Sequence, residues 1–194
     1  MCKTVLLTID DARRRSAEEF IKDTYAARYG ARLEAFPSRI IALLDHREAI
    51  LCAAGLRFLD DGFFSERYLD APIEDVVSAM SARAVTRSAI FEVTTLASRA
   101  PLATAEFITE IGGFGEKAGF DWSFFTLTRR LQLLVSRLGV AVSCLGEADR
   151  QRIADSERWG TYYACQPKVY AVASRRLTKD SDHAQNGGRY AAAI

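Results

Sequence analysis

One carboxylate, that of Glu92, stands in the middle of Ser88–Leu96, a run of otherwise apolar and hydroxyl-bearing residues. Such a run is typical of a buried strand. An ionisable side chain there either pairs with an opposite charge, for which Arg57 and Arg87 are candidates, or serves a function, and both roles can hold together. We therefore expect Glu92 to mark a reactive site, as a base or as an orienting group.

The segment from Arg87 to Gly139 supplies the elements that would position this carboxylate. A helix over Leu102–Lys117 follows the first strand, because its large apolar residues recur at helical spacing. Phe120–Leu127 is a nearly unbroken apolar run, as in a strand covered on both faces, and a second helix follows Thr128. Because a crossover helix joins the two strands, they should be parallel, with a ligand near their carboxyl ends.

Three glycines, Gly112, Gly113 and Gly115, interrupt the pattern of the first of these helices. Each glycine costs a helix about 1 kcal/mol relative to alanine. Either the helix ends early, near Ile111, or it packs very close to the sheet.

The rest of the chain predicts further strands and helices on either side of this segment. Before it, we expect a strand at Cys2–Ile9, a helix that ends at Gly30, and a hairpin of Arg39–Leu44 with Ala49–Leu59. Gly55 in the second hairpin strand indicates a bulge.

Beyond Gly139 the pattern predicts a short strand at Val140–Cys144, a polar helix at Glu147–Glu157 and a last strand at Lys168–Ala173. The length favours one domain, over residues 1–173. Residues 174–194 are polar and lack a periodic apolar face, so we expect a flexible tail there.

The composition is that of a soluble globular protein, with 49% hydrophobic residues, 26% charged residues and a net charge of +1. This charge does not point to nucleic acid. We find no N-terminal signal peptide and no apolar run long enough to span a membrane, and expect a cytoplasmic protein. The cysteines lack metal-ligand spacing, so no metal site is expected, and Cys52 and Cys144 are expected in the core.

Four segments carry a resemblance to a known family: GLRFLDDGFFSERYLDAPIE, RSAIFEVTTLAS, FDWSFFTLTRRLQLLVSRLG and WGTYYACQPKVYAV. The order and the amino-acid sequences of these segments resemble the thermostable hemolysin (delta-type) family over roughly Phe20 to Val172. That family is distantly similar to acyl-homoserine-lactone synthases and N-acyl amino acid synthases. The resemblance implies their α/β GNAT acyltransferase fold, with a mixed central sheet and helices on both faces.

The resemblance also implies an N-acyltransferase. The acyl group would move from a thioester, on acyl carrier protein or coenzyme A, to the amine of a small acceptor, giving an amphiphilic fatty amide. Metals and permanently bound cofactors are not part of this chemistry, and acyl-phosphopantetheine is a co-substrate. Glu92 would be the functional glutamate, and backbone N–H groups of Thr94, Thr95 and Leu96 would bind the oxyanion.

The donor is expected to be carrier-bound, because the connection ASRAPLA lacks the Gly-rich loop that holds the coenzyme A pyrophosphate in ordinary GNAT enzymes. Arg99 and Arg130 are the candidate contacts to an acidic acyl carrier protein, and Arg129 could meet a substrate carboxylate. The alternative for all three arginines is simple exposure to solvent.

A polar and aromatic loop beside a cleft could select the acceptor. The residues expected to bind substrate are Arg57, Glu66, Arg67, Tyr68, Leu96, Arg129, Tyr162 and Tyr163. Tyr25 is expected in the core, although Tyr25 and Tyr29, near a helix end, could also close a cleft.

Two rival hypotheses remain beside the enzyme: a directly membrane-active hemolysin, and an inactive GNAT-fold binding protein. The first has little physical support, because no spanning segment and no long basic amphipathic helix is present. An amphiphilic product would instead explain membrane lysis.

Overall fold

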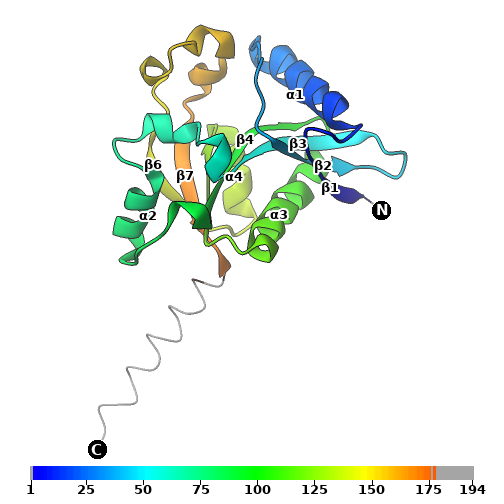
Figure 1. Ribbon diagram of the computed structural model, residues 1–194. Coiled ribbons are helices and arrows are strands. Elements are labelled where there is room, and N and C mark those ends of the chain that lie inside the picture. Colours follow the sequence, from blue (N-terminus) through cyan, green and yellow to red (C-terminus); the bar gives the residue numbers. More distant parts are fainter. Residues whose placement is uncertain (1, 176, 178–194) are drawn as a thin grey trace, which may run out of the picture.

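A computed structural model describes residues 2–175 and 177 of the chain. These residues form a seven-stranded sheet in the order β1-β2-β3-β4-β5-β7-β6 (Figure 1). The strands are β1 Lys3–Leu7, β2 Arg39–Leu44, β3 Ile50–Arg57, β4 Ile90–Ser98, β5 Trp122–Leu127, β6 Ser143–Glu147 and β7 Lys168–Ala173. The helices of more than one turn are α1 Arg14–Tyr29, α2 Ile73–Ser81, α3 Pro101–Ala118 and α4 Arg129–Arg137. Among the seven strands of the described residues, only β4 and β5 pair in parallel, which confirms the mixed sheet and the parallel pair.

Helices α1 and α3 cover opposite faces of the sheet, as Figure 1 shows. The alternation of side chains along β2 explains why. Ile40, Ala42 and Leu44 pack in the cluster that contains the buried side of α1, whereas Ile41 and Leu43 pack with Phe107 and Ile111 of α3. Successive residues of a strand point to opposite faces, so an apolar run such as RIIALL requires a cover on both.

The glycines of α3 do not end the helix, which runs unbroken to Ala118 and ends at Gly119. The alternative of an early end near Ile111 is therefore wrong. Close packing on the sheet holds for Gly115, where an added Cβ would lie 2.6 Å from Cε1 of Phe91. It does not hold for Gly112 and Gly113, since no atom lies within 4 Å of an added Cβ there.

The predicted hairpin of β2 and β3 is confirmed, and so is an irregularity at Gly55. Ala53 pairs with Ala97 and Gly55 pairs with Thr94, so two residues of β4 face the single residue Ala54 of β3. The extra residue of this bulge is therefore on β4, at the centre of the sheet. A bulge bends its strand and leaves one residue outside the ladder.

Three predictions for the C-terminal part need correction. The strand after Gly139 lies at Ser143–Glu147 rather than Val140–Cys144, and Cys144 is exposed because β6 is an edge strand. The predicted helix at Glu147–Glu157 is replaced by short 3₁₀ turns.

The turns form because the buried residues of this stretch, Ala148 and Ile153, are five positions apart, which no single helix face provides. The Asp149 carboxylate also accepts a hydrogen bond from the backbone N–H of Gln151, which favours a local turn. By contrast, β7 and the buried Cys52 confirm their predictions. Most of the predicted tail, residues 176 and 178–194, lies outside the described residues.

Candidate functional site

Strands β4 and β5 separate at their carboxyl ends. They pair only from Ile90 with Trp122 to Val93 with Phe125, although β4 continues to Ser98. The bulge on β4 comes directly after the last pair and turns β4 away from its neighbour. We call this point the splay, and it is formed by Thr95 and Leu96 on β4 with Thr126 and Leu127 on β5. It is the edge where the sequence predicted a ligand.

Thr95, at the splay, has a left-handed backbone with φ of 49°. A β-branched residue is rarely found there, and such a conformation costs about 1–3 kcal/mol. The Thr95 hydroxyl is also buried without a hydrogen-bond partner among the described residues. Neither feature has a local structural compensation, so both suggest a group that is held ready for a ligand.

A cavity of about 960 Å³ opens from the splay and continues between α3 and α4. Most of its lining is apolar. The aliphatic and aromatic side chains that contribute include Val93, Leu96, Ile108, Ile111, Trp122, Phe125, Leu127, Leu131, Leu133, Leu134, Val135, Leu138, Val140 and Val172. A cavity whose lining is mainly apolar can hold a hydrocarbon chain, and the hydroxyl and charged groups in the same lining can bind the polar end of the ligand.

Aromatic and basic residues line the cavity beside the splay. Tyr25, Tyr29 and Tyr162 form a ring cluster, with the ring centroids of Tyr29 and Tyr162 5.3 Å apart. Arg28 and Arg130 line the same cavity. Burial raises the pKa of the Tyr29 phenol, while the positive charge of Arg28 counteracts that rise. Tyr162, predicted to bind substrate, and Arg130, predicted to bind the carrier, thus both line this cavity.

Glu92 is fully buried and is bound by the loop that precedes α2. Its Oε2 accepts a 2.6 Å hydrogen bond from the backbone N–H of Phe64, and its Oε1 accepts one of 2.7 Å from that of Ser65. Burial raises the pKa of Glu92 from its ordinary 4.5 to about 7, although hydrogen bonds from Ser65 and Phe64 oppose this rise. A carboxyl group with this pKa can both take up and release a proton near neutral pH.

The alternative of an ion pair between Glu92 and Arg57 or Arg87 is not found among the described residues, although the positive charge of Arg57 lowers the pKa of Glu92. Arg57 lies opposite Glu92 across β3 and β4, but its Nη1 donates to the backbone carbonyls of Asp61 and Gly62. Arg87 is held by Glu66 and Glu74 at 2.6 Å. The backbone of a folded loop therefore satisfies Glu92 in place of an arginine.

A hydroxyl pair joins the surroundings of Glu92 to the cavity. Oγ of Ser65 lies 2.8 Å from Oγ1 of Thr126, and the Ser65 hydroxyl also lowers the pKa of the Glu92 carboxyl. Thr126 lines the cavity, whereas Glu92 does not. The hydroxyls of Ser65 and Thr126 therefore lie between the residue that binds Glu92 and the cavity.

Several predicted residues support the site without lining the cavity. Glu66 binds Arg87 and the backbone N–H of Ile73, and Arg67 stacks over the Phe64 ring at 5.1 Å. The hydroxyls of Tyr68 and Tyr163 hydrogen-bond to each other at 2.7 Å. These contacts fix the loop that binds Glu92.

Of the remaining predicted residues, three lie outside the cavity lining and two belong to it. Arg99 pairs with Asp23 on α1 at 3.4 Å and stacks on Phe20. Arg129 is exposed at the start of α4, and Thr94 does not line the cavity. Leu96 and Thr95 do line it.

The sequence did not point to Ser65 or Thr126 as functional residues. Thr126 had a weak signal, as a hydroxyl within an apolar strand, but Ser65 had none, because its role depends on where the loop folds. Within the described part of the chain, no group of three or more His, Cys, Asp or Glu side chains could hold a metal ion.

The family model described as thermostable hemolysin matches residues 7–177. The chain belongs to the thermostable hemolysin family. A comparison with curated proteins finds no match.

Solved structures show the same fold at low sequence identity. The acyl-homoserine-lactone synthase LasI has a TM-score of 0.61 at 9% identity, over 90% of this chain and 91% of that protein. FeeM, an N-acyl amino acid synthase from uncultured soil microbes, has a TM-score of 0.56 at 12% identity, over 92% and 95%. BjaI, a CoA-dependent acyl-homoserine-lactone synthase, has 0.58 at 12%, over 96% and 90%. The predicted GNAT-like fold is therefore confirmed.

Proposed function

We propose that this protein is an N-acyltransferase that moves a fatty acyl group from a thioester to the amine of a small acceptor. The observation that carries this proposal is the splay at Thr95, because a strained central strand opens there directly into an apolar cavity. The names of the structural relatives LasI, FeeM and BjaI, all synthases of N-acyl compounds, agree with it.

The thioester carbonyl would sit at the splay, with the acyl chain in the cavity. Backbone N–H groups at the bulge, from Thr95 and Leu96, would stabilise the oxyanion that forms when the amine attacks. The C–N bond forms, the C–S bond breaks, and the leaving thiolate takes up the proton that the amine releases. The amine must lose a proton, which would pass through the hydroxyls of Thr126 and Ser65 to Glu92.

We propose a carrier-bound donor, because the protein's own groups occupy the N-terminus of α3. Pro101 has no N–H, and the Ala100 N–H donates to the Ser98 hydroxyl, which in turn bonds with Thr104 at 2.7 Å. This leaves few donors for a pyrophosphate. Arg28 and Arg130 on the rim would meet an acidic acyl carrier protein, although the same fold in BjaI is named as CoA-dependent.

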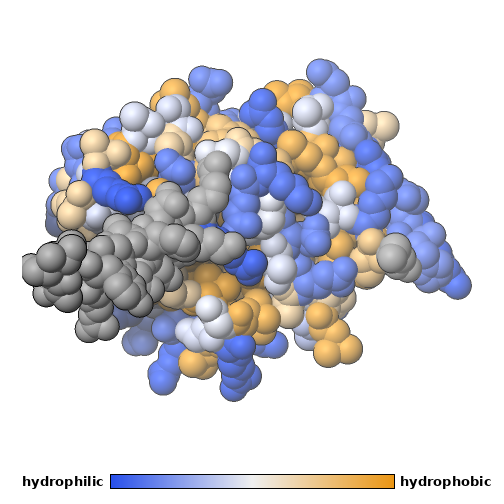
Figure 2. All heavy atoms as spheres, turned by 90° about the horizontal axis from the view of Figure 1, so that it is seen from below, coloured by the Kyte–Doolittle hydropathy of each residue, from blue (hydrophilic) through white to orange (hydrophobic). Residues whose placement is uncertain are grey.

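Membrane lysis, which the family description suggests, would then come from the amphiphilic product of a cytoplasmic enzyme. Among the described residues, no helix combines the length and the apolar character needed to cross a membrane. On the described part of the face in Figure 2, apolar patches alternate with hydrophilic residues.

The test compares organic extracts of cells that express the wild type with extracts of cells that express Glu92→Gln. Mass spectrometry should detect new fatty amides in the wild-type extract alone, and only that extract should lyse membranes. Identical lipid profiles, or dye release from vesicles by the purified protein without any acyl donor, would contradict the proposal.

A further inference from the structure

The three glycines of α3 have different explanations. At Gly115 a side chain would collide with Phe91, so packing requires glycine. At Gly112 no atom lies within 4 Å of an added Cβ, and the backbone is not left-handed. Neither packing nor conformation requires glycine there, although glycine weakens the middle of a helix.

Gly112 faces the cavity. It lies one turn after Ile108 and one turn before Glu116, and all three line the cavity. Residues four positions apart share one face of a helix, so a side chain at 112 would extend into the same space.

The side of the cavity formed by α4 is apolar and incompletely covered. Of the nine residues of α4 only Val135 is buried, while Leu133, which lines the cavity, is 49% exposed. Covering an exposed leucine with an apolar group is favourable, because it removes apolar surface from water. The space between Gly112 and α4 therefore suits a hydrocarbon chain.

The same cavity reaches the splay, where the thioester carbonyl is proposed to sit. Near the first turn of α3, Thr104 hydrogen-bonds to Ser98 at the end of β4. Gly112 lies eight residues further along the helix, roughly 12 Å away. A butanoyl chain that enters the cavity beside Thr104 is too short to reach Gly112, whereas a dodecanoyl chain spans this length of the helix.

We propose that the space left by Gly112 holds the tail of a long acyl chain, so that this residue sets the acyl length that the protein accepts. This inference rests on the proposed acyltransferase function and adds its substrate class, a medium- to long-chain fatty acyl thioester.

The experiment measures calorimetric binding of thioether analogues of butanoyl-, octanoyl-, dodecanoyl- and hexadecanoyl-pantetheine, which cannot be cleaved. The wild type should bind the two longer analogues more tightly than the butanoyl analogue. Gly112→Leu should weaken binding of the longer analogues by about tenfold or more and leave butanoyl binding unchanged. Its Tm should rise by about 2–4 °C, because a helix glycine is removed from an open position.

Ala118→Leu is the matched control, since Ala118 is the exposed last residue of α3 and does not line the cavity. Ala118→Leu should bind the two longer analogues more tightly than the butanoyl analogue, as the wild type does. A folded Gly112→Leu protein that keeps full affinity for the long analogues, or an equal loss in Ala118→Leu, overturns the inference and leaves the proposed function standing. If the wild type binds no analogue of any length, the proposed function fails, and the inference with it.

Discussion

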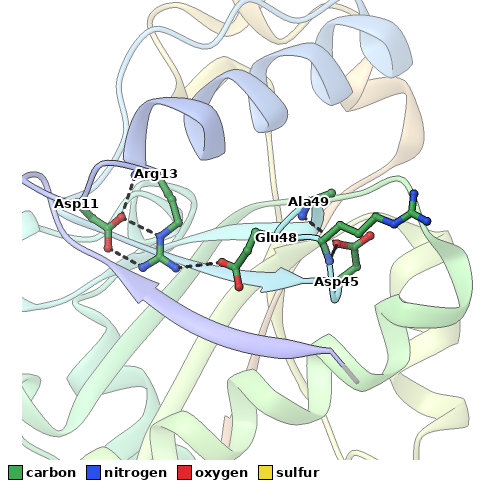
Figure 3. A network of polar contacts seen from close by, with 6 residues as sticks. Asp11, Arg13, Asp45, Glu48 and Ala49 are labelled. Atoms are coloured by element: carbon green, nitrogen blue, oxygen red, sulfur yellow. Dashed lines mark hydrogen bonds and ion pairs between the residues drawn. The ribbon is translucent and has the colours of Figure 1, made fainter.

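Glu48 and Thr95 both hold a left-handed backbone, yet their surroundings differ. Glu48, with φ of 62°, lies in the exposed turn between β2 and β3. Figure 3 shows that this turn is held by local bonds: the Asp45 carboxylate accepts the backbone N–H of Ala49 at 2.9 Å, and Glu48 faces Arg13 at 3.6 Å. Arg13 is held in turn by Asp11.

Thr95 has no such local explanation. It lies in the central strand β4, and its buried hydroxyl has no partner among the described residues. Strain in a turn with its own hydrogen bonds contributes to the fold, whereas uncompensated strain in a core strand is typical of a functional site. The comparison predicts that changes at the splay affect activity more than stability, and that changes at the turn do the reverse.

The largest expected effect is that of Glu92→Gln on acyl transfer. Without a proton acceptor the rate should fall by about 10²–10⁴-fold. Acyl transfer to an identified acceptor measures this, with circular dichroism as the check of folding and Glu48→Gln as the control. A folded variant with full activity would exclude a role of Glu92 in proton transfer.

The pH dependence of stability should show the next effect. Because folding raises the pKa of Glu92 from 4.5 to about 7, the folded protein holds this proton more tightly than the unfolded chain. The free energy of unfolding should therefore fall, by about 3 kcal/mol, as pH rises from about 4.5 to 7. Urea unfolding of the wild type minus that of Glu92→Gln isolates this contribution. Parallel curves for the two proteins would contradict the buried, proton-binding state of Glu92.

Thr126→Val should interrupt the hydroxyl chain between the cavity and Glu92. We expect kcat to fall by about ten- to a hundredfold with little change in KM, and stability to fall by about 1 kcal/mol. Thr126→Ser should restore kcat, because it restores the hydroxyl. A valine variant with an unchanged kcat and pH profile would exclude this proton path.

Thr95→Gly tests the strain directly. Glycine accepts a positive φ without penalty, so the free energy of unfolding should rise by about 1 kcal/mol. Activity should nevertheless fall, because the bulge becomes less rigid. Glu48→Gly in the exposed turn should leave activity at the wild-type level. If Thr95→Gly and Glu48→Gly changed activity equally, the backbone strain at the splay would have no more functional importance than that in the turn.

The smallest effect is expected for Asp45→Ala, which removes the acceptor for the backbone N–H groups of Arg47 and Ala49. Stability should fall by about 0.5–1.5 kcal/mol, and acyl transfer should not change. Thermal unfolding and the transfer assay measure the two quantities. A loss of activity without unfolding would show that the turn is coupled to the site.

Local patterns were sufficient to predict most of the elements. The β2–β3 hairpin, strand β7 and the parallel pairing of β4 with β5 follow from apolar periodicity, turn spacing and the need for a crossover helix. The predicted helix at Glu147–Glu157 failed because its polar pattern has no apolar face, and packing of Ala148 and Ile153 decided the outcome. The prediction that Cys144 lies in the core was wrong, because the sequence does not reveal which strand lies at the edge of the sheet.

For the site, the sequence by itself determined that a carboxylate would be buried in a central strand, because no other charge interrupts Ser88–Leu96. Only the tertiary structure decided which groups donate hydrogen bonds to this carboxylate. Phe64 and Ser65 lie in a loop, 28 and 27 residues before Glu92, and only the packing of the chain brings this loop to the carboxylate. Gly112 and Gly115 are likewise indistinguishable in the sequence. They differ only in what lies opposite, since Phe91 fills the space beside one and a cavity lies beside the other.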